Sequence, residues 1–104
     1  MTTETYSLTN PSKPTITKDP NAVLDYSWDW SEWLAPLTDT ILSFQIILGT
    51  GSTLAVDSSL RVGGVVTAFL SGGTLGATES ATCRIVTAGG RTDDRTIYLK
   101  IAQR

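Results

Sequence analysis

The stretch KDPNAVLDYSWDWSEWL (residues 18–34) decides the fold class of this chain. It contains all three tryptophans of the protein, and between residues 24 and 30 large apolar side chains alternate with aspartate and serine. An alternation with a period of two predicts a β-strand with one buried face. The side chains that share this face are Leu24, Tyr26, Trp28 and Trp30. So much aromatic area predicts either the anchor of a small core or a surface that faces a partner.

Short alternating segments, separated by turns rich in glycine and serine, follow along the rest of the chain. The segments predicted as strands are residues 22–30, 41–48, 54–56, 65–70, 80–86 and 96–101, and those predicted as turns are residues 49–52, 57–59, 71–73 and 88–91. No helical periodicity competes with this pattern, so the sequence predicts an all-β, immunoglobulin-like antiparallel β-sandwich. Its predicted core consists of Leu24, Tyr26, Trp28, Phe44, Ile46, Val66, Ala68, Cys83, Ile85, Ile97 and Leu99.

The first part of the chain differs in composition from the rest, because it is rich in proline, threonine and serine and poor in large apolar residues. Pro11 and Pro14 favour an extended chain over a helix. We therefore expect residues 1–19 to form an extended N-terminal arm and residues 20–104 to form the sandwich. The arm is either a flexible terminus or ordered only against a neighbouring protein. A chain that lacks residues 1–17 is accordingly expected to fold but to assemble poorly.

Composition argues against several classes of function. The 104 residues include no histidine, and no glycine-rich phosphate loop is present, so neither an enzyme nor a bound cofactor is expected. A net charge of −2 gives no basic face for nucleic acid, and no apolar run reaches the roughly 20 residues that cross a membrane. The N-terminus has no signal-peptide pattern, which predicts synthesis in a cytoplasm. The single cysteine, Cys83, is expected to be a small buried side chain.

Two groups of acidic residues are candidate sites. Asp93 and Asp94 lie between Arg91 and Arg95 in the run GGRTDDR, and this pattern favours an ion-paired turn over a calcium site. The other group is Asp25, Asp29 and Glu32, whose spacing matches no cation-binding loop and predicts a solvated face. We therefore predict no metal site.

Three interpretations of the tryptophans remain open: core packing, a protein interface, or a platform on which sugars stack. Trp28 and Trp30 share the parity of Leu24, which favours the core. Trp33 lies beyond the alternating run, and it is the best interface candidate of the three.

Three pieces of the chain together resemble a known family. They are KDPNAVLDYSWDWSEWL (residues 18–34), FLSGGTLGA (residues 69–77) and CRIVTAGGRTDDRTIYLKI (residues 83–101). The combination resembles the phage fibre–tail adaptor family, which consists of small immunoglobulin-like proteins of tailed-phage virions. The most specific parts are the opening KDP-x-AVLDY-x-x-DW-x-x-WL and the closing GRTDDR-x-x-x-L, whereas residues 49–64 carry no family signature.

The resemblance implies a non-enzymatic structural protein of a tailed-phage virion, made in the host bacterial cytoplasm, that docks fibres onto the tail, neck or collar. Its implied partners are other virion proteins (fibre, tail, neck or connector) and copies of itself. Two alternatives remain: a head, collar or capsid decoration protein, and a carbohydrate-binding sandwich for host attachment. The candidate interface residues are Pro11, Pro14, Lys18, Asp19, Trp33, Arg91, Asp93, Asp94 and Arg95.

Overall fold

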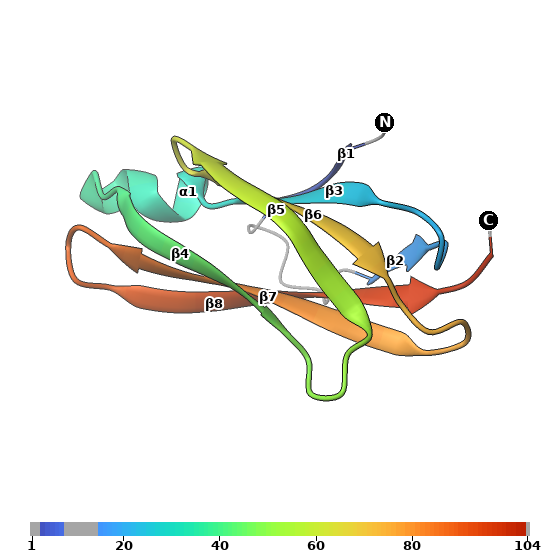
Figure 1. Cartoon of the computed structure of the whole chain (residues 1–104). Coiled ribbons are helices and arrows are strands. Elements are labelled where there is room, and N and C mark those ends of the chain that lie inside the picture. Colours follow the sequence, from blue (N-terminus) through green and yellow to red (C-terminus); the bar gives the residue numbers. More distant parts are fainter. Residues whose placement is uncertain (1–2, 8–14, 104) are drawn as a thin grey trace.

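A computed structural model of the chain describes residues 3–7 and 15–103. Its elements are β1 (Thr3–Ser7), β2 (Thr15–Lys18), β3 (Leu24–Asp29), the short helix α1 (Ser31–Leu34), the 3₁₀ turn η1 (Ala35–Leu37), β4 (Ile41–Leu48), β5 (Leu54–Val62), β6 (Val65–Gly72), β7 (Thr78–Thr87) and β8 (Thr92–Ile101). Strands dominate these elements, and they stack as two layers (Figure 1). The predicted all-β sandwich is therefore confirmed.

Each layer is a sheet of four strands. The first sheet has the order β1-β3-β6-β5 and the second has the order β2-β8-β7-β4. Two strands from the start of the chain pair in parallel, β1 with β3 and β2 with β8, and all other pairs are antiparallel. When β1 and β3–β8 are lettered A to G, the sheets read ABED and GFC, which is the strand order of a constant-type immunoglobulin sandwich. The narrower immunoglobulin-like type stays a prediction that this order supports.

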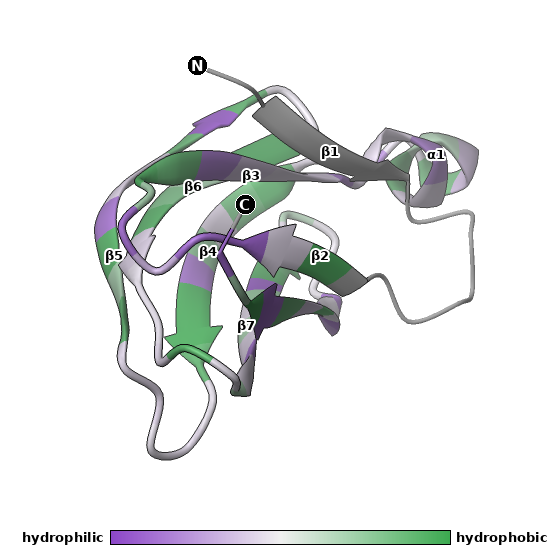
Figure 2. Ribbon diagram, turned by 90° about the vertical axis from the view of Figure 1, so that its right-hand side faces the viewer, coloured by the Kyte–Doolittle hydropathy of each residue, from purple (hydrophilic) through white to green (hydrophobic). Residues whose placement is uncertain are grey.

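The core lies between the two sheets, where alternate side chains of each strand meet. The fully buried part of the predicted core is Tyr26, Trp28, Val66, Ala68, Cys83, Ile85, Ile97 and Leu99, while Leu24, Phe44 and Ile46 are partly buried against it. Further core residues that the predicted core list omits are Ile16, Trp30, Leu34, Ile41, Leu54, Leu70, Ala81 and Ile101. Figure 2 looks along the sandwich and shows the two layers, with β5 on one side and α1 on the other.

One predicted strand face is wrong at its start, because β4 contains a β-bulge. A strict period of two over residues 41–48 predicts that Leu42 shares the inner face with the predicted core residues Phe44 and Ile46. In the structure Ile41 is opposite Thr87 and Ser43 is opposite Val86, so Leu42 is an additional residue with no partner of its own. Ile41 consequently points into the core, and Leu42 is 70% exposed.

A second correction concerns residues 57–59, which were predicted as a turn. Their composition, Asp-Ser-Ser, is typical of turns, yet β5 runs through them to Val62. A bulge between Val56 and Ser58 accommodates Asp57, whose Oδ1 accepts a hydrogen bond from Ser71 Oγ at 2.8 Å. The chain reverses instead at Gly63, which has a φ of 58°.

The start of the chain also differs from the expected arm outside the core. β1 and β2 are edge strands of the two sheets, and Ile16 and Lys18 on β2 are buried. The packed domain therefore begins before residue 20. Pro11 and Pro14 lie outside the described residues.

Candidate functional site

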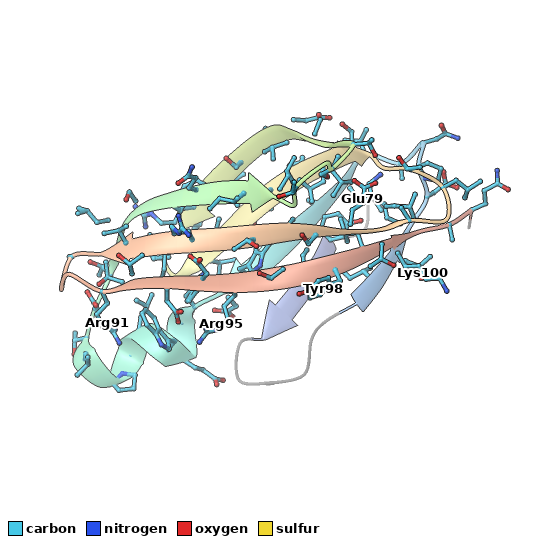
Figure 3. The ribbon with its side chains drawn as sticks, turned by 90° about the horizontal axis from the view of Figure 1, so that it is seen from below. Glu79, Arg91, Arg95, Tyr98 and Lys100 are labelled. Carbon is cyan, nitrogen blue, oxygen red and sulfur yellow. The ribbon has the colours of Figure 1, made fainter. Side chains whose placement is uncertain are left out.

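The two most distinctive pieces of the sequence meet at one end of the sandwich. α1 and the residue before it provide Trp33 and Trp30, whereas the β7–β8 turn and β8 provide Arg91 and Arg95. Figure 3 shows Arg91 and Arg95 beside α1. The Arg91 guanidinium carbon lies 3.9 Å from the Trp33 ring centroid, the two indole rings pack edge to face at 5.4 Å, and the Arg95 guanidinium carbon lies 5.4 Å from the Trp30 centroid. We call these four residues the tryptophan–arginine cluster.

The register of β8 explains why the two arginines reach the tryptophans. Ile97, Leu99 and Ile101 on the inner face of β8 are buried in the core. Arg91, Asp93 and Arg95 have the same parity, so they continue this inner row beyond the aliphatic core. Trp30 follows β3 of the other sheet. Its side chain is buried, and its backbone amide donates a hydrogen bond to the carbonyl of Gly64 at 2.8 Å.

Asp39, in the loop after η1, holds Arg91 of the tryptophan–arginine cluster in place. Its carboxylate accepts hydrogen bonds from the Gly89 amide at 2.9 Å and from Arg91 Nε at 3.0 Å. A hydrogen bond with Thr87, together with those from Gly89, Thr40 and Arg91, outweighs the opposing effect of burial and lowers the pKa of Asp39 to about 2. The ionised carboxylate of Asp39 therefore links the loop after η1 to the β7–β8 turn.

Of the ion pairs predicted within the run GGRTDDR, the structure contains one, and its residues do not form a turn. Residues 92–101 are strand β8, and Arg95 Nη1 pairs with Asp93 Oδ2 at 2.6 Å along it. Asp94 points to the opposite face and accepts two hydrogen bonds from Arg84 of β7, at 2.8 and 3.0 Å. These hydrogen bonds lower the pKa of Asp94. Arg91 pairs with Asp39 rather than with either neighbouring carboxylate.

The candidate interface residues fall into separate places. Trp33, Arg91, Asp93 and Arg95 lie together at the helical end; the Arg91 side chain is 29% exposed and that of Arg95 is 37% exposed. Asp94 lies on the outer face, beside a shallow depression that Arg84, Thr92 and Asp93 also line. Asp19 lies in the turn between β2 and β3, where its Oδ1 accepts a hydrogen bond from the Asn21 amide.

Lys18, which was predicted as an interface residue, lies in the interior. Its ammonium donates to the carbonyls of Asp19, Ala22 and Gly72 at 2.9, 2.7 and 2.7 Å. Desolvation by burial lowers its pKa, although Asp19, Glu79 and Asp57 oppose that effect. All three donors of the ammonium are thus used to join the β2–β3 turn to the end of β6.

Sequence reasoning missed Glu79 of β7, which ties two loops together near the other end of the sandwich (Figure 3). Its carboxylate accepts hydrogen bonds from the amides of Thr53 and Thr74, at 2.6 and 2.7 Å, and from the hydroxyls of Ser52 and Thr53. Burial raises its pKa, but these hydrogen bonds prevail and lower it to about 2. A lone glutamate in a strand carries no local signal of this role.

Leu37 was also missed. It is 67% exposed at the end of η1, in the segment that follows Trp33. The local signal is weak: Pro36 ends the alternating pattern, and Leu37 follows it as a single apolar residue.

Two of the three tryptophans are not accessible. Trp28 and Trp30 are buried, which supports the core interpretation for both, while Trp33 is partly buried with Arg91 over its ring. Within the part of the chain that the structure describes, no group of three or more His, Cys, Asp and Glu side chains is placed to hold a metal ion. The helices among those residues are all too short to cross a membrane.

Comparison with known proteins gives one family match. A family model described as podophage GP4 fiber-tail adaptor protein gp77 matches residues 18–100. This span contains the sandwich from the last residue of β2 and includes the whole tryptophan–arginine cluster. No curated protein matches the chain.

Proposed function

Since the chain belongs to the fiber-tail adaptor family of podophages, a family of structural virion proteins, we propose that it docks a fibre onto the tail, neck or collar of the particle without catalysing a reaction. The observation that carries the proposal is the tryptophan–arginine cluster, in which residues of segments 30–34 and 90–95 contact one another. These residues belong to the two most specific pieces of the resemblance to the adaptor family. The proposal assigns them to one surface rather than to separate strands.

The helical end has the composition of a docking surface. Trp33, Arg91 and Arg95 are of the residue types that contribute most to protein–protein binding, and exposed Leu37 adds apolar area beside them. We define Trp33, Leu37, Arg91, Asp93 and Arg95 as the helical-end surface. Its charges are held by Asp39 and by pairing within β8, so little side-chain entropy is lost when a partner binds.

The proposal is tested by replacing exposed residues in particles. A phage that lacks this gene is complemented with Leu37→Glu or Arg95→Glu, and the fibre and adaptor contents of purified virions are measured by mass spectrometry and cryo-electron microscopy. We expect the fibre content to fall several-fold, because a carboxylate at an apolar contact, or a charge reversal, opposes docking. The adaptor content of the same virions shows which partner binds this surface. If the variant adaptor stays in the virion while the fibre is lost, the fibre binds here. If the adaptor itself is lost from the virion, the tail binds here.

Leu75→Glu is the matched control, since Leu75 is an exposed leucine in the loop between β6 and β7. It makes the same chemical change away from the helical end. Normal fibre content in both helical-end variants would contradict the assignment of this surface. Absence of the unmodified protein from virions would contradict the proposed function itself.

A further inference from the structure

The edge strands of the two sheets are β1, β5, β2 and β4, and three of them have features that oppose pairing with a further strand. Natural sheets protect their edges with short strands, charged side chains and bulges. β1 and β2 have only five and four residues, and β5 contains a bulge together with Asp57 and Arg61. β4, in contrast, is the eight-residue run ILSFQIIL without a charge or a proline, and its bulge lies at its start, between Ile41 and Ser43. The rest of its edge is open to pairing.

The backbone of β4 presents regularly spaced hydrogen-bonding groups along this edge. The amide of Gly49, directly after β4, donates to the carbonyl of Ser80 at 3.1 Å. Successive pairs of an antiparallel ladder alternate between those that exchange hydrogen bonds and those that do not. It follows that the amide of Gln45 points to β7, whereas the amides of Phe44 and Ile46 point away from it. Within the described part of the chain, no strand pairs with β4 on that side.

The neighbouring edge strand, β5, is exposed on both faces. Every residue of β5 after Leu54 is exposed, although Ser59 is opposite buried Ala68 and Arg61 is opposite buried Val66. Residues that lie opposite each other share one face of a sheet, so the inner side of β5 extends beyond the cover of the second sheet. β4 and β5 both extend between their connecting loop and the end of the sandwich that carries α1 (Figure 1). A strand added to the edge of β4 would therefore lie beneath the uncovered side of β5.

We propose that β4 binds an extended peptide segment of a partner protein as an additional strand of its sheet. Backbone hydrogen bonds at Phe44 and Ile46 supply the affinity, and alternate side chains of the peptide enter the space beneath β5. This space has apolar walls. Phe44 and Ile46 are only partly buried against the core, and Val56, which is opposite buried Leu70, is 37% exposed. A peptide with apolar residues at alternate positions fits these walls.

The charge of Arg61 defines the peptide further. Its guanidinium donates to the Gly63 carbonyl at 3.0 Å, and none of the ion pairs among the described residues involves it. A carboxylate on the peptide, at the end that lies near α1, complements this cation. Pairing of β4 with the same strand of a second copy supplies no such group, because the eight residues of β4 include no carboxylate. The occupant is therefore a partner segment that combines alternating apolar residues with an acidic one.

This inference goes beyond the proposed docking of fibres, because it uses no residue of the helical-end surface and its test needs only the purified protein. A surface-display library of random octapeptides is selected against the full chain. We expect the enriched peptides to alternate apolar and polar residues, and to contain acidic residues in several-fold excess over basic ones. Selection against Arg61→Glu should reverse this charge preference. Lys100→Glu is the matched control, since Lys100 is an exposed cation on the outer face of β8, and it should leave the preference unchanged.

Amide hydrogen exchange locates the peptide on the protein. The amides of Phe44 and Ile46 face the open edge, so they should exchange several-fold more slowly in the complex with the most enriched peptide. The amide of Gln45, which already points to β7, is the control within the same strand and should change little.

Four results would overturn the proposal. They are the absence of any enriched peptide, an acidic preference that survives Arg61→Glu, slower exchange at a different edge, and enrichment of uncharged peptides similar to β4. The last result would indicate that β4 pairs between copies of this chain.

Discussion

The guanidinium of Arg91 lies 3.9 Å from the ring centroid of Trp33, while its Nε donates to Asp39 at 3.0 Å. One side chain therefore joins the β7–β8 turn both to α1 and to the loop before β4. The contact needs a planar cation, because the guanidinium lies over the ring and donates a hydrogen bond at the same time. It connects two sequence segments that are about 60 residues apart.

Arg91→Lys should lower the free energy of unfolding by about 1 kcal/mol, since an ammonium cannot lie over the ring and donate to Asp39 in the same geometry. In a domain of this size, 1 kcal/mol corresponds to a fall in Tm of roughly 4–8 °C. Thermal unfolding followed by tryptophan fluorescence measures the change. Arg61→Lys is the control, because Arg61 is exposed and donates to the Gly63 carbonyl two residues away. Equal effects of the two substitutions would show that the stacking contributes nothing.

Stability should fall in acid because of Asp39 and Glu79. The ordinary pKa values of these groups are 3.8 and 4.5, and in the folded protein both are lowered to about 2. A depressed carboxylate pKa stabilises the fold above the ordinary value, and this contribution is lost as pH falls toward the folded value. The urea midpoint should therefore decrease mainly between about pH 5 and pH 2.

Glu79→Gln tests this linkage, because the amide keeps the size of the side chain but does not ionise. The variant should be less stable than the unmodified protein at pH 7, and it should lose less stability on acidification. Glu32→Gln, at an exposed residue in the first turn of α1, should leave the pH profile unchanged. An unaltered acid profile in Glu79→Gln would show that the four hydrogen bonds of Glu79 do not contribute.

Much of the sandwich was predictable, because the alternation that marks a half-buried strand is intact in most segments. Val66–Ala68 and Ile97–Leu99 illustrate this, since their parities predict burial correctly. The alternation fails at Leu42 and at residues 57–59, where a bulge adds one residue and reverses the parity. A bulge depends on the register with the neighbouring strand, which the local sequence does not contain.

The candidate site was only partly predictable for a related reason. Trp33, Arg91 and Arg95 stood out because of their residue types, but the pairing of Arg91 with Asp39 links positions 52 residues apart. Lys18 was misplaced because a lysine in a turn-like KDP sequence is ordinarily exposed. Only the convergence of three carbonyls from two chain segments makes its burial tolerable.

Gly72→Ala should destabilise the fold by about 2 kcal/mol or more, for two combined reasons. Gly72 has a φ of 80°, and an added Cβ would lie 2.6 Å from the Thr53 carbonyl oxygen. Gly63→Ala is the matched control, because Gly63 has a φ of 58° and an added Cβ there has open space around it. The difference between their urea midpoints measures the cost of the close approach. Equal midpoints would show that the backbone at Thr53 moves aside freely.

The structure changes the expectation for a chain without residues 1–17. This deletion removes Ile16, which is buried, and most of β2, which pairs with Tyr98–Ile101 of β8. Loss of the Ile16 side chain alone should cost about 2 kcal/mol or more, so the shortened protein should be clearly less stable and not merely slow to assemble. A deletion of residues 1–7 removes β1 and keeps β2, and Ile16→Ala isolates the side chain in the full chain. We expect Ile16→Ala to account for a large part of the loss in urea unfolding of the longer deletion. If the chain without residues 1–17 were as stable as the full chain, β2 would add nothing to the core, and the start of the chain would act only as an arm.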